Sequence, residues 1–328
     1  MKAALALALA ACSAPLARGH AGWAAARRLA AVLAAILLLG GPFPTAGAED
    51  TPQRVVTLAP SATELVYAAG AGGNIVGTVL SSDYPPAARN IPRIGDGIQF
   101  DQETILALRP TLVVGWLASG GSQALAAVLR NLGVPMIYAD PRSLDQIPGL
   151  IRELGRHLDT SLVADRAAAA LRARIDALDA PAGRPLTVFI EVGVDPLYTL
   201  GKDPLVDDML ARCGGVNPYA DRAVAAPQAS VESVLRIDPD VVIVSPYGRQ
   251  TLAARSAYWS GLGLRAAMRG HLYAIDPDWL HRPGPRLVDA AEALCADLDR
   301  VRADLRVETG LAANPENTTG PDYPRGSS

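Results

Sequence analysis

The sequence has few residues of the kinds that carry catalysis or bind nucleic acid. Histidine occurs four times, charged residues make up 19% of the chain, and the formal net charge is -3. This balance offers no positive surface for a phosphate backbone, so we expect no nucleic-acid partner. Hydrophobic residues make up 50%, which excludes a mostly disordered chain. The 328 residues leave room for two domains of roughly 100 to 150 residues each.

No catalytic constellation is recognisable. None of His157, His271 and His281 lies in an HExxH arrangement, and the chain has no GxSxG, no Walker phosphate loop and no complete GxGxxG after a strand. We therefore expect a binding protein without catalytic residues, metal site or cofactor. The alternative from another class, a two-domain enzyme such as a chelatase or a metal-cluster protein, needs a catalytic cluster that the sequence does not offer.

The amino terminus has the pattern of an export signal. Two arginines precede an apolar run at residues 29–39, and small residues at 46–48 suit a cleavage site. We expect residues 1–48 to be a signal peptide. A permanent transmembrane helix is disfavoured because it needs about 20 apolar residues. A lipid anchor at Cys12 is also disfavoured, because it would leave the apolar run on the mature protein.

Only two cysteines follow the expected signal peptide. Cys213 and Cys295 are 82 residues apart (295 − 213). An even pair in an oxidising compartment favours a disulfide, and two buried free thiols are the alternative. Neither cysteine has the CxxC partner or ligand cluster of a metal site.

Short β-branched runs alternate with longer amphipathic stretches, which is typical of strands and crossover helices in a mostly parallel sheet. The expected strands cover residues 55–58, 75–79, 112–114 and 136–139 in the first half and 187–192, 241–244 and 272–275 in the second. Residues 61–69 are expected to form a helix. The pattern predicts an α/β fold class.

An internal repeat indicates two lobes of like build. Residues 103–114 match residues 232–243 at an offset of 129 (232 − 103). In each copy a short helix begins near the first residue, a proline ends the connection because it cannot continue a helix, and an apolar strand follows. Chance similarity between two helix-to-strand units is the alternative. The repeat favours two Rossmann-like lobes with a ligand cleft between them.

One helix is expected to join the lobes. Residues 161–180 contain strong helix formers and neither glycine nor proline. Twenty residues would span about 30 Å, and a single stiff helix would permit only small motion between the lobes. The expected parts are a signal peptide (1–48), an N-terminal lobe (53–158), a connecting helix (159–181), a C-terminal lobe (184–307) and a disordered tail (308–328).

Aromatic residues make up only 5% of the chain, so their positions after strands are informative. The rings at such positions are Tyr84, Trp116, Tyr198 and Trp279. Open α/β sheets bind ligands at the carboxyl ends of their strands, so two facing lobes would form a cleft whose rings cover a large flat ligand. Each ring alone is more often an ordinary packing residue, but the same placement in both halves favours the site.

Charged residues mark two further candidate surfaces. Arg282 and Arg286 lie near Trp279 and could bind amide or carboxylate groups of a ligand, although Arg286 could instead pair with Asp289 or cap a helix. Glu103 and Glu232 occupy equivalent repeat positions near helix amino termini, where negative charge is favoured. Alternatively, these glutamates form a docking pair for a two-fold symmetric partner that carries arginines.

Several short motifs together resemble a known family. They are Ser61-Ala-Thr-Glu64-Leu, Ser82-Asp-Tyr-Pro-Pro86, Glu103 to Pro110 with Trp116, Gly201-Lys202, Cys213-Gly-Gly215, Pro227-Gln228 before Glu232, Asp278-Trp279 and Pro285-Arg286. Over roughly residues 53 to 300 the sequence resembles the periplasmic binding proteins of vitamin B12 import. These belong to a wider group that binds haem and iron siderophores and joins its lobes by one helix.

The resemblance implies roles for particular residues. It implies that the ligand cleft is lined by Tyr84, Trp116, Tyr198, Trp279 and Arg282. It also implies that Glu103 and Glu232 meet arginines on an inner-membrane ABC permease, which works with an ATPase, and that Cys213 and Cys295 form the family's disulfide. The expected protein is a periplasmic monomer whose ligand is cobalamin or a related corrinoid.

The sequence departs from the family pattern at two positions. Gly97 and Ala226 stand where a vitamin B12 binder would place further tryptophans. The exact ligand therefore stays open. Haem or a ferric siderophore is the alternative, with Tyr84, Tyr198 or His281 as an iron ligand or cleft contact.

Overall fold

The computed structural model describes residues 53–178, 183–246 and 251–308. Chain contacts divide the protein between Pro52 and Gln53, and every residue described below belongs to the second unit. The expected signal peptide, the alternative anchor at Cys12 and the expected tail beyond Glu308 lie outside the described residues. Within the described part, no helix combines the length and apolar character needed to cross a bilayer.

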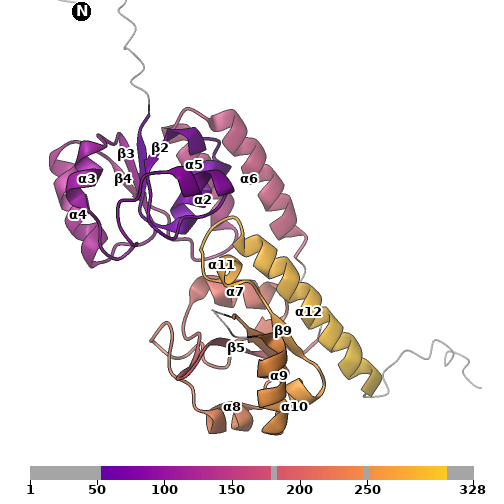
Figure 1. Cartoon of the computed structure of the whole chain (residues 1–328). Helices are drawn as coiled ribbons and strands as arrows, with labels where there is room; N and C mark the ends of the chain where they lie inside the picture. Colours follow the sequence, from indigo (N-terminus) through magenta and orange to yellow (C-terminus); the bar gives the residue numbers. More distant parts are fainter. Residues whose placement is uncertain (1–52, 179–182, 247–250, 309–328) are drawn as a thin grey trace, which may run out of the picture. The chain divides into compact units, whose positions relative to one another are not determined.

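The first lobe contains a four-stranded parallel sheet in the order β2-β1-β3-β4 (Figure 1). Its strands are β1 (Val55–Thr57), β2 (Ile75–Gly77), β3 (Leu112–Gly115) and β4 (Met136–Tyr138). The two central strands, β1 and β3, are buried at every position. They lack an apolar-polar alternation because helices cover both faces of a parallel sheet.

Helices surround this sheet. They are α2 (Pro60–Ala68), α3 (Gln102–Ala107), α4 (Gly120–Asn131), α5 (Gln146–His157) and α6 (Ser161–Asp176), with short 3-10 turns η1 (Gly72–Asn74) and η2 (Pro86–Asn90). Helix α2 begins at Pro60, whose missing N–H costs nothing at a helix start, and no side chain caps it.

The second lobe contains a sheet in the order β6-β5-β8-β9, and β7 pairs with β5 beside this path. Its strands are β5 (Leu186–Val194), β6 (Leu197–Thr199), β7 (Gly215–Val216), β8 (Val241–Val244) and β9 (Leu272–Ala274). Its helices are α7 (Pro204–Arg212), α8 (Val231–Ile237), α9 (Leu252–Gly261), α10 (Arg265–Met268), α11 (Pro277–Leu280) and α12 (Leu287–Glu308). All seven predicted strands are confirmed within a few residues, whereas β6 and β7 were not predicted.

The internal repeat is confirmed in the backbone. Helices α3 and α8 begin at equivalent positions, and each is capped by a side chain, Asp101 in the first and Ser230 in the second. Before the proline of each copy the chain takes a left-handed conformation, with φ of 47° at Arg109 and 49° at Asp238. Strands β3 and β8 then run through the centres of the two sheets.

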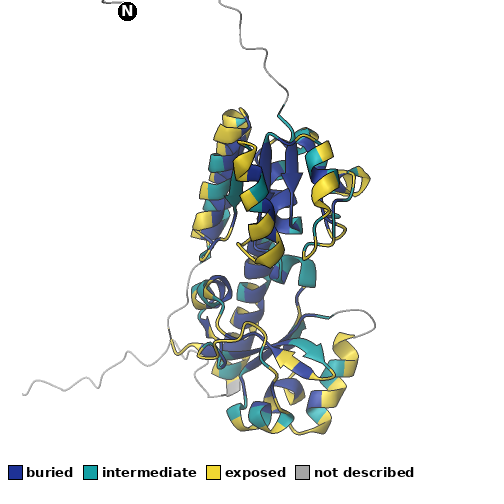
Figure 2. Cartoon of the chain, turned by 90° about the vertical axis from the view of Figure 1, so that its left-hand side faces the viewer, coloured by how far each residue is buried: buried dark blue, intermediate teal, exposed yellow. Residues whose placement is uncertain are grey.

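One continuous cluster of buried apolar residues extends through both lobes. It includes Val55 and Val114 of the first sheet, and Val188 and Ile243 of the second. Figure 2 shows the buried strands at the centre of each lobe and exposed positions along the outer helices. The lobes therefore share part of their core.

Two long helices and a disulfide reinforce this shared core. Helix α6 covers most of the segment predicted to connect the lobes, and it packs against α12. Arg174 of α6 donates hydrogen bonds to Asp289 and Glu292 of α12, at N···O distances of 2.5 and 2.7 Å. The predicted disulfide between Cys213 and Cys295 is confirmed, and it ties the end of α7 to α12.

Candidate ligand-binding site

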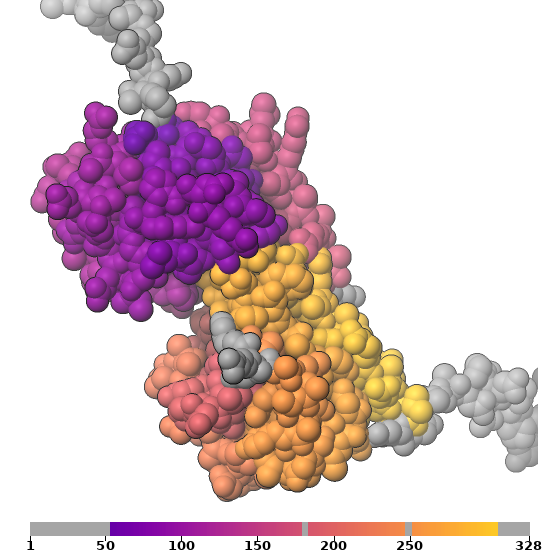
Figure 3. Space-filling model, viewed as in Figure 1, coloured from indigo at the N-terminus to yellow at the C-terminus, as the bar shows by residue number. Residues whose placement is uncertain are grey.

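A cavity of about 640 Å³ is lined by residues of both lobes. The first lobe contributes Trp116 to Ala118 after β3 and Asp140 to Arg142 after β4. The space-filling view shows a notch between the surfaces of the two lobes (Figure 3). The cavity volume is within the range of roughly 300 to 1,000 Å³ found for small-molecule sites.

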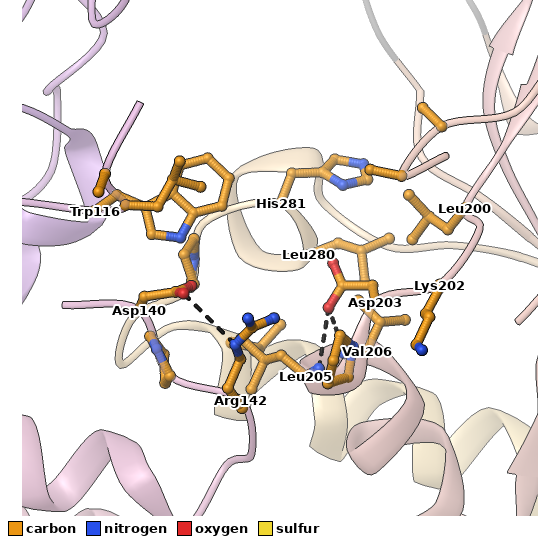
Figure 4. A pocket seen from close by; sticks show the side chains of 18 residues that line it. Trp116, Asp140, Arg142, Leu200, Lys202, Asp203, Leu205, Val206, Leu280 and His281 are labelled. Carbon is orange, nitrogen blue, oxygen red and sulfur yellow. Dashed lines mark hydrogen bonds and ion pairs between the residues drawn. The ribbon is translucent and has the colours of Figure 1, made fainter. Parts of the chain in front are cut away.

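The second lobe supplies a largely apolar wall. Its lining residues are Leu200, Lys202 to Val206, Ala225, Ala226, Leu280, His281, Pro283 and Leu287. Figure 4 shows Trp116 and Asp140 on one side of the cavity and Leu200 and Lys202 on the other. Trp116 is 41% exposed, so much of its indole is available to a ligand.

Charged side chains lie beside this apolar surface. Arg142 pairs with Asp140 at 3.5 Å, and both are exposed. The Asp203 carboxylate accepts hydrogen bonds from the N–H groups of Leu205 and Val206 at 3.0 and 3.2 Å, which caps α7 and fixes the wall. The cavity therefore combines an apolar surface with polar groups, a combination suited to a large amphipathic ligand.

His281 places an imidazole in the cavity lining. Its Nε2 atom lies 2.9 Å from Oγ of Ser245, at the end of β8. Burial lowers the pKa of His281 below its ordinary value, and the negative charge of Asp203 acts in the opposite direction. A neutral imidazole is a common ligand of metal ions and a hydrogen-bonding group.

The predicted ligand residues occupy different places around this cavity. Trp116 lines the cavity. Trp279 lies in α11, half-buried against the shared core, directly before the cavity residue Leu280. Tyr198 lies exposed within β6 rather than in a loop, two residues before Leu200.

Tyr84 and Arg282 belong to a separate charged group, the interlobe cluster, whose members are Glu64, Asp83, Tyr84, Asp278, Arg282 and Arg286. Arg282 pairs with Asp83 and Asp278, each at 2.7 Å. The guanidinium of Arg286 lies 4.3 Å from the centre of the Tyr84 ring. Arg286 bonds Glu64 of the first lobe, so the considered pairing with Asp289 is wrong.

The two repeat glutamates are exposed. Glu103 lies in the first turn of α3 and Glu232 in the first turn of α8. The structure thus gives them equivalent backbone positions in the two lobes, with side chains accessible to another protein.

Sequence reasoning missed part of the cavity. Asp140 and Arg142 follow a predicted strand, so the rule that led to Trp116 could also have found them. Leu205 and Val206 line the cavity from the first turn of α7, and no sequence pattern distinguishes them from ordinary core residues. Among the described residues, no group of three or more His, Cys, Asp or Glu is arranged to hold a metal ion.

Comparison with known proteins confirms the predicted family. The pattern of the periplasmic binding protein family matches residues 55–279. The chain belongs to this family. The vitamin B12-binding protein of Pectobacterium atrosepticum is 34% identical over 258 residues, which covers 76% of this chain and 90% of that protein.

Two solved structures of family members support the two-lobed α/β fold. The periplasmic vitamin B12 binding protein BtuF of Vibrio cholerae is 33% identical and has a TM-score of 0.70, with 76% of this chain and 98% of that one covered. The periplasmic heme-binding protein RhuT from Roseiflexus sp. RS-1 is 32% identical and has a TM-score of 0.65, with the same shares covered.

Proposed function

We propose that this family member is the substrate-binding component of an ABC importer, which captures cobalamin or a related corrinoid in the periplasm. The observation that carries the proposal is the cavity between two strand-end surfaces, with an exposed indole facing an apolar wall. The identity of about one third to vitamin B12-binding proteins, over most of their length, favours a corrinoid over other flat ligands.

Each kind of cavity group has a part in binding. Trp116 stacks on or packs against the corrin ring, and the apolar wall takes its methyl-rich edge. The charged groups Arg142 and Lys202 bind the amide oxygens at the ring periphery. Ala225 and Ala226 leave space beside the ring for bulky substituents. The protein binds this ligand without changing it.

The remaining predicted ligand residues extend the site beyond the cavity. Tyr84, Tyr198 and Trp279 contact the parts of a corrinoid that project from it, since a corrinoid is larger than the ligands that such a cavity encloses completely. Arg282 contributes a positive charge at the edge of the site, from its position in the interlobe cluster.

Delivery depends on the two exposed glutamates. We propose that Glu103 and Glu232 each pair with arginines on one half of a two-fold symmetric permease. One glutamate lies in each of the two lobes, at residues 53–158 and 184–307, which the connecting helix joins. Charge reversal, Glu103→Arg or Glu232→Arg, should abolish stimulation of the permease-bound ATPase in proteoliposomes and leave corrinoid binding unchanged. Full stimulation by both variants would exclude this docking mode.

A retention assay tests the ligand. The purified protein is mixed separately with cyanocobalamin, cobinamide, haemin and a ferric siderophore, desalted, and examined by absorbance and titration calorimetry. Retention of cyanocobalamin or cobinamide at a one-to-one ratio is the expected result. Retention of none of these ligands would refute the proposed function.

Haem is the second candidate ligand. It is favoured by the half-buried imidazole of His281 in the cavity lining, whose pKa burial lowers, and by the similarity to RhuT. If haemin is retained, His281→Ala should alter the Soret band of the bound haem. If a corrinoid is retained and its spectrum is the same in His281→Ala as in wild type, His281 is not a metal ligand. Tyr84→Phe and Tyr198→Phe test the two phenols in the same way.

A further inference from the structure

Glu64 is a carboxylate buried inside the protein at a place where the two lobes meet. It lies in α2 of the first lobe, and its side chain is 2% exposed. Arg286, which directly precedes α12 of the second lobe, donates from Nε and Nη2 to the two carboxylate oxygens of Glu64, at 3.0 and 2.7 Å. A buried charge is tolerated only with such partners, and the two-pronged pairing fixes the relative orientation of both groups.

A second arginine of the same segment approaches the same carboxylate. Nη1 of Arg282 lies 3.6 Å from Glu64 and 2.7 Å from Asp83, and its Nη2 lies 2.7 Å from Asp278. Arg286 also lies over the ring of Tyr84. Glu64 therefore contacts both arginines of the segment that joins α11 to α12, and Arg282 in turn contacts Asp83 in the loop after β2.

That segment also forms part of the cavity. Leu280, His281 and Pro283 line the cavity, while Arg282 and Arg286 of the same segment pair with Glu64. Gly284 lies against the backbone of Ser61 at the start of α2: a Cβ atom at Gly284 would lie 3.5 Å from the Ser61 carbonyl oxygen. A change in the pairing of Glu64 would therefore move a wall of the cavity.

The first-lobe side of the cluster is held independently. The buried hydroxyl groups of Thr57, Thr63, Thr78 and Ser82 form a hydrogen-bonded network with O···O distances of 2.8 to 3.0 Å. Thr63 precedes Glu64 and Ser82 precedes Asp83, so this network ties α2 to the loop that carries Tyr84. The contacts that depend on Glu64 are therefore those with the second lobe.

We propose that Glu64 is a positioning residue for ligand capture, whose carboxylate holds Arg282 and Arg286 and thereby fixes the cavity wall at residues 280–283 against the first lobe. The inference rests on the proposed function for its effect on affinity. Its structural part, the coupling of the two segments, is independent of which ligand is bound.

The charge state of Glu64 gives this role a pH dependence. Burial raises the pKa of Glu64 above its ordinary value, and the hydrogen bonds and charges of Arg286 and Arg282 oppose that effect. Asp83 and Asp278 also face these arginines. Protonation of Glu64 removes one acceptor and the charge that gathers the arginines, so ligand affinity should fall as the pH falls into the acidic range.

A matched control is present in the second lobe. Glu191 is 1% exposed and accepts two hydrogen bonds from Arg255, at 2.5 and 2.8 Å. Glu191 and Arg255 both belong to the second lobe, and neither lines the cavity. Glu64→Gln and Glu191→Gln therefore remove the same kind of buried pairing, and both should lower stability, but only Glu64→Gln should change the site.

Two measurements on the full mature chain test the proposal. Titration calorimetry with cyanocobalamin at pH 7.5 and pH 5 should show a Kd at least about tenfold higher for Glu64→Gln at pH 7.5 and a loss of the wild-type pH dependence, with Glu191→Gln close to wild type. Hydrogen exchange of the ligand-free protein should show faster exchange in residues 278–290 for Glu64→Gln, and in α9 for Glu191→Gln.

Each outcome has a defined meaning. If wild type binds cyanocobalamin and Glu64→Gln has wild-type affinity, pH profile and exchange, the positioning role is excluded. If wild type binds no corrinoid, the proposed function fails, and the exchange data alone decide the coupling. If Glu64→Gln does not fold, Arg286→Lys takes its place, since it keeps the charge and loses the two-pronged pairing. It must reproduce the affinity loss, or the inference is wrong.

Discussion

Removal of the Trp116 indole should weaken ligand binding, and the exposed area of this side chain determines by how much. The side chain is 41% exposed in the cavity wall. Aromatic side chains bury about 150 to 250 Å² when fully covered, so roughly 60 to 100 Å² of Trp116 remains for a ligand to cover. At about 25 cal/mol per Å², this surface contributes about 1.5 to 2.5 kcal/mol.

Ring stacking adds to this area term. A stacked aromatic pair contributes about 0.5 to 1.5 kcal/mol beyond burial, so complete coverage of Trp116 is worth about 2 to 4 kcal/mol. Trp116→Ala should therefore raise the Kd for cyanocobalamin about 30-fold or more, because each 1.4 kcal/mol is a factor of ten. Trp116→Phe keeps a ring and should raise it less. Titration calorimetry on both variants measures the difference directly.

Trp259 provides the control for this experiment. It is 0% exposed, and its indole N–H donates to Glu191 within the second lobe. Trp259→Phe should lower the denaturation midpoint and leave the Kd unchanged. If Trp116→Ala binds cyanocobalamin as tightly as wild type while remaining folded, the cavity is not where the corrin ring binds, and the assignment of the site fails.

Three further predictions concern stability and motion. Cys213→Ala with Cys295→Ala should lower the free energy of unfolding by about 4.5 kcal/mol, from the 82-residue loop that the disulfide closes; urea denaturation measures this loss, and reduction of wild type should reproduce it. Burial raises the pKa of Asp297 to about 6, from 3.8. The folded state therefore binds more protons between these values, and stability should fall by about 2 kcal/mol as the pH rises from 4 to 6; Asp297→Asn should abolish this fall in denaturation curves, and an unchanged slope would contradict the assignment. Small-angle scattering with and without cyanocobalamin should show a change in the radius of gyration below about 1 Å, whereas a wide domain rotation would refute the expectation of small lobe motion.

The fold was predictable where local patterns determine structure. The apolar runs of β1, β3 and β8 and the duplicated helix-to-strand unit could be recognised in sequence because a buried parallel strand needs consecutive apolar residues. Strands β6 and β7 are two or three residues long, and pairing with β5 defines them. Neither strand is a run of consecutive buried apolar residues, so the pattern that revealed β1, β3 and β8 is missing from them.

The candidate site was predictable only where it follows strand ends. Trp116 could be placed because it directly follows an expected strand. The pairing of Glu64 with Arg286 joins residues 222 positions apart, and each alone resembles an ordinary helix residue. Arg282 was expected to face the ligand, whereas its charged partners in the structure are carboxylates of both lobes. Such long-range ion pairs depend on how the lobes pack against each other, and no local sequence pattern indicates that packing.

The apolar wall of the cavity is also the surface of the core that the lobes share. Leu200, Leu205, Leu280 and Leu287 belong both to the continuous buried cluster and to the cavity lining. Wide separation of the lobes would expose this cluster to water, which costs about 25 cal/mol for each Å² of apolar surface. We therefore expect the cavity to be formed before a ligand arrives, and capture to depend on the side chains and loops above it, such as Trp116, rather than on closure of one lobe onto the other.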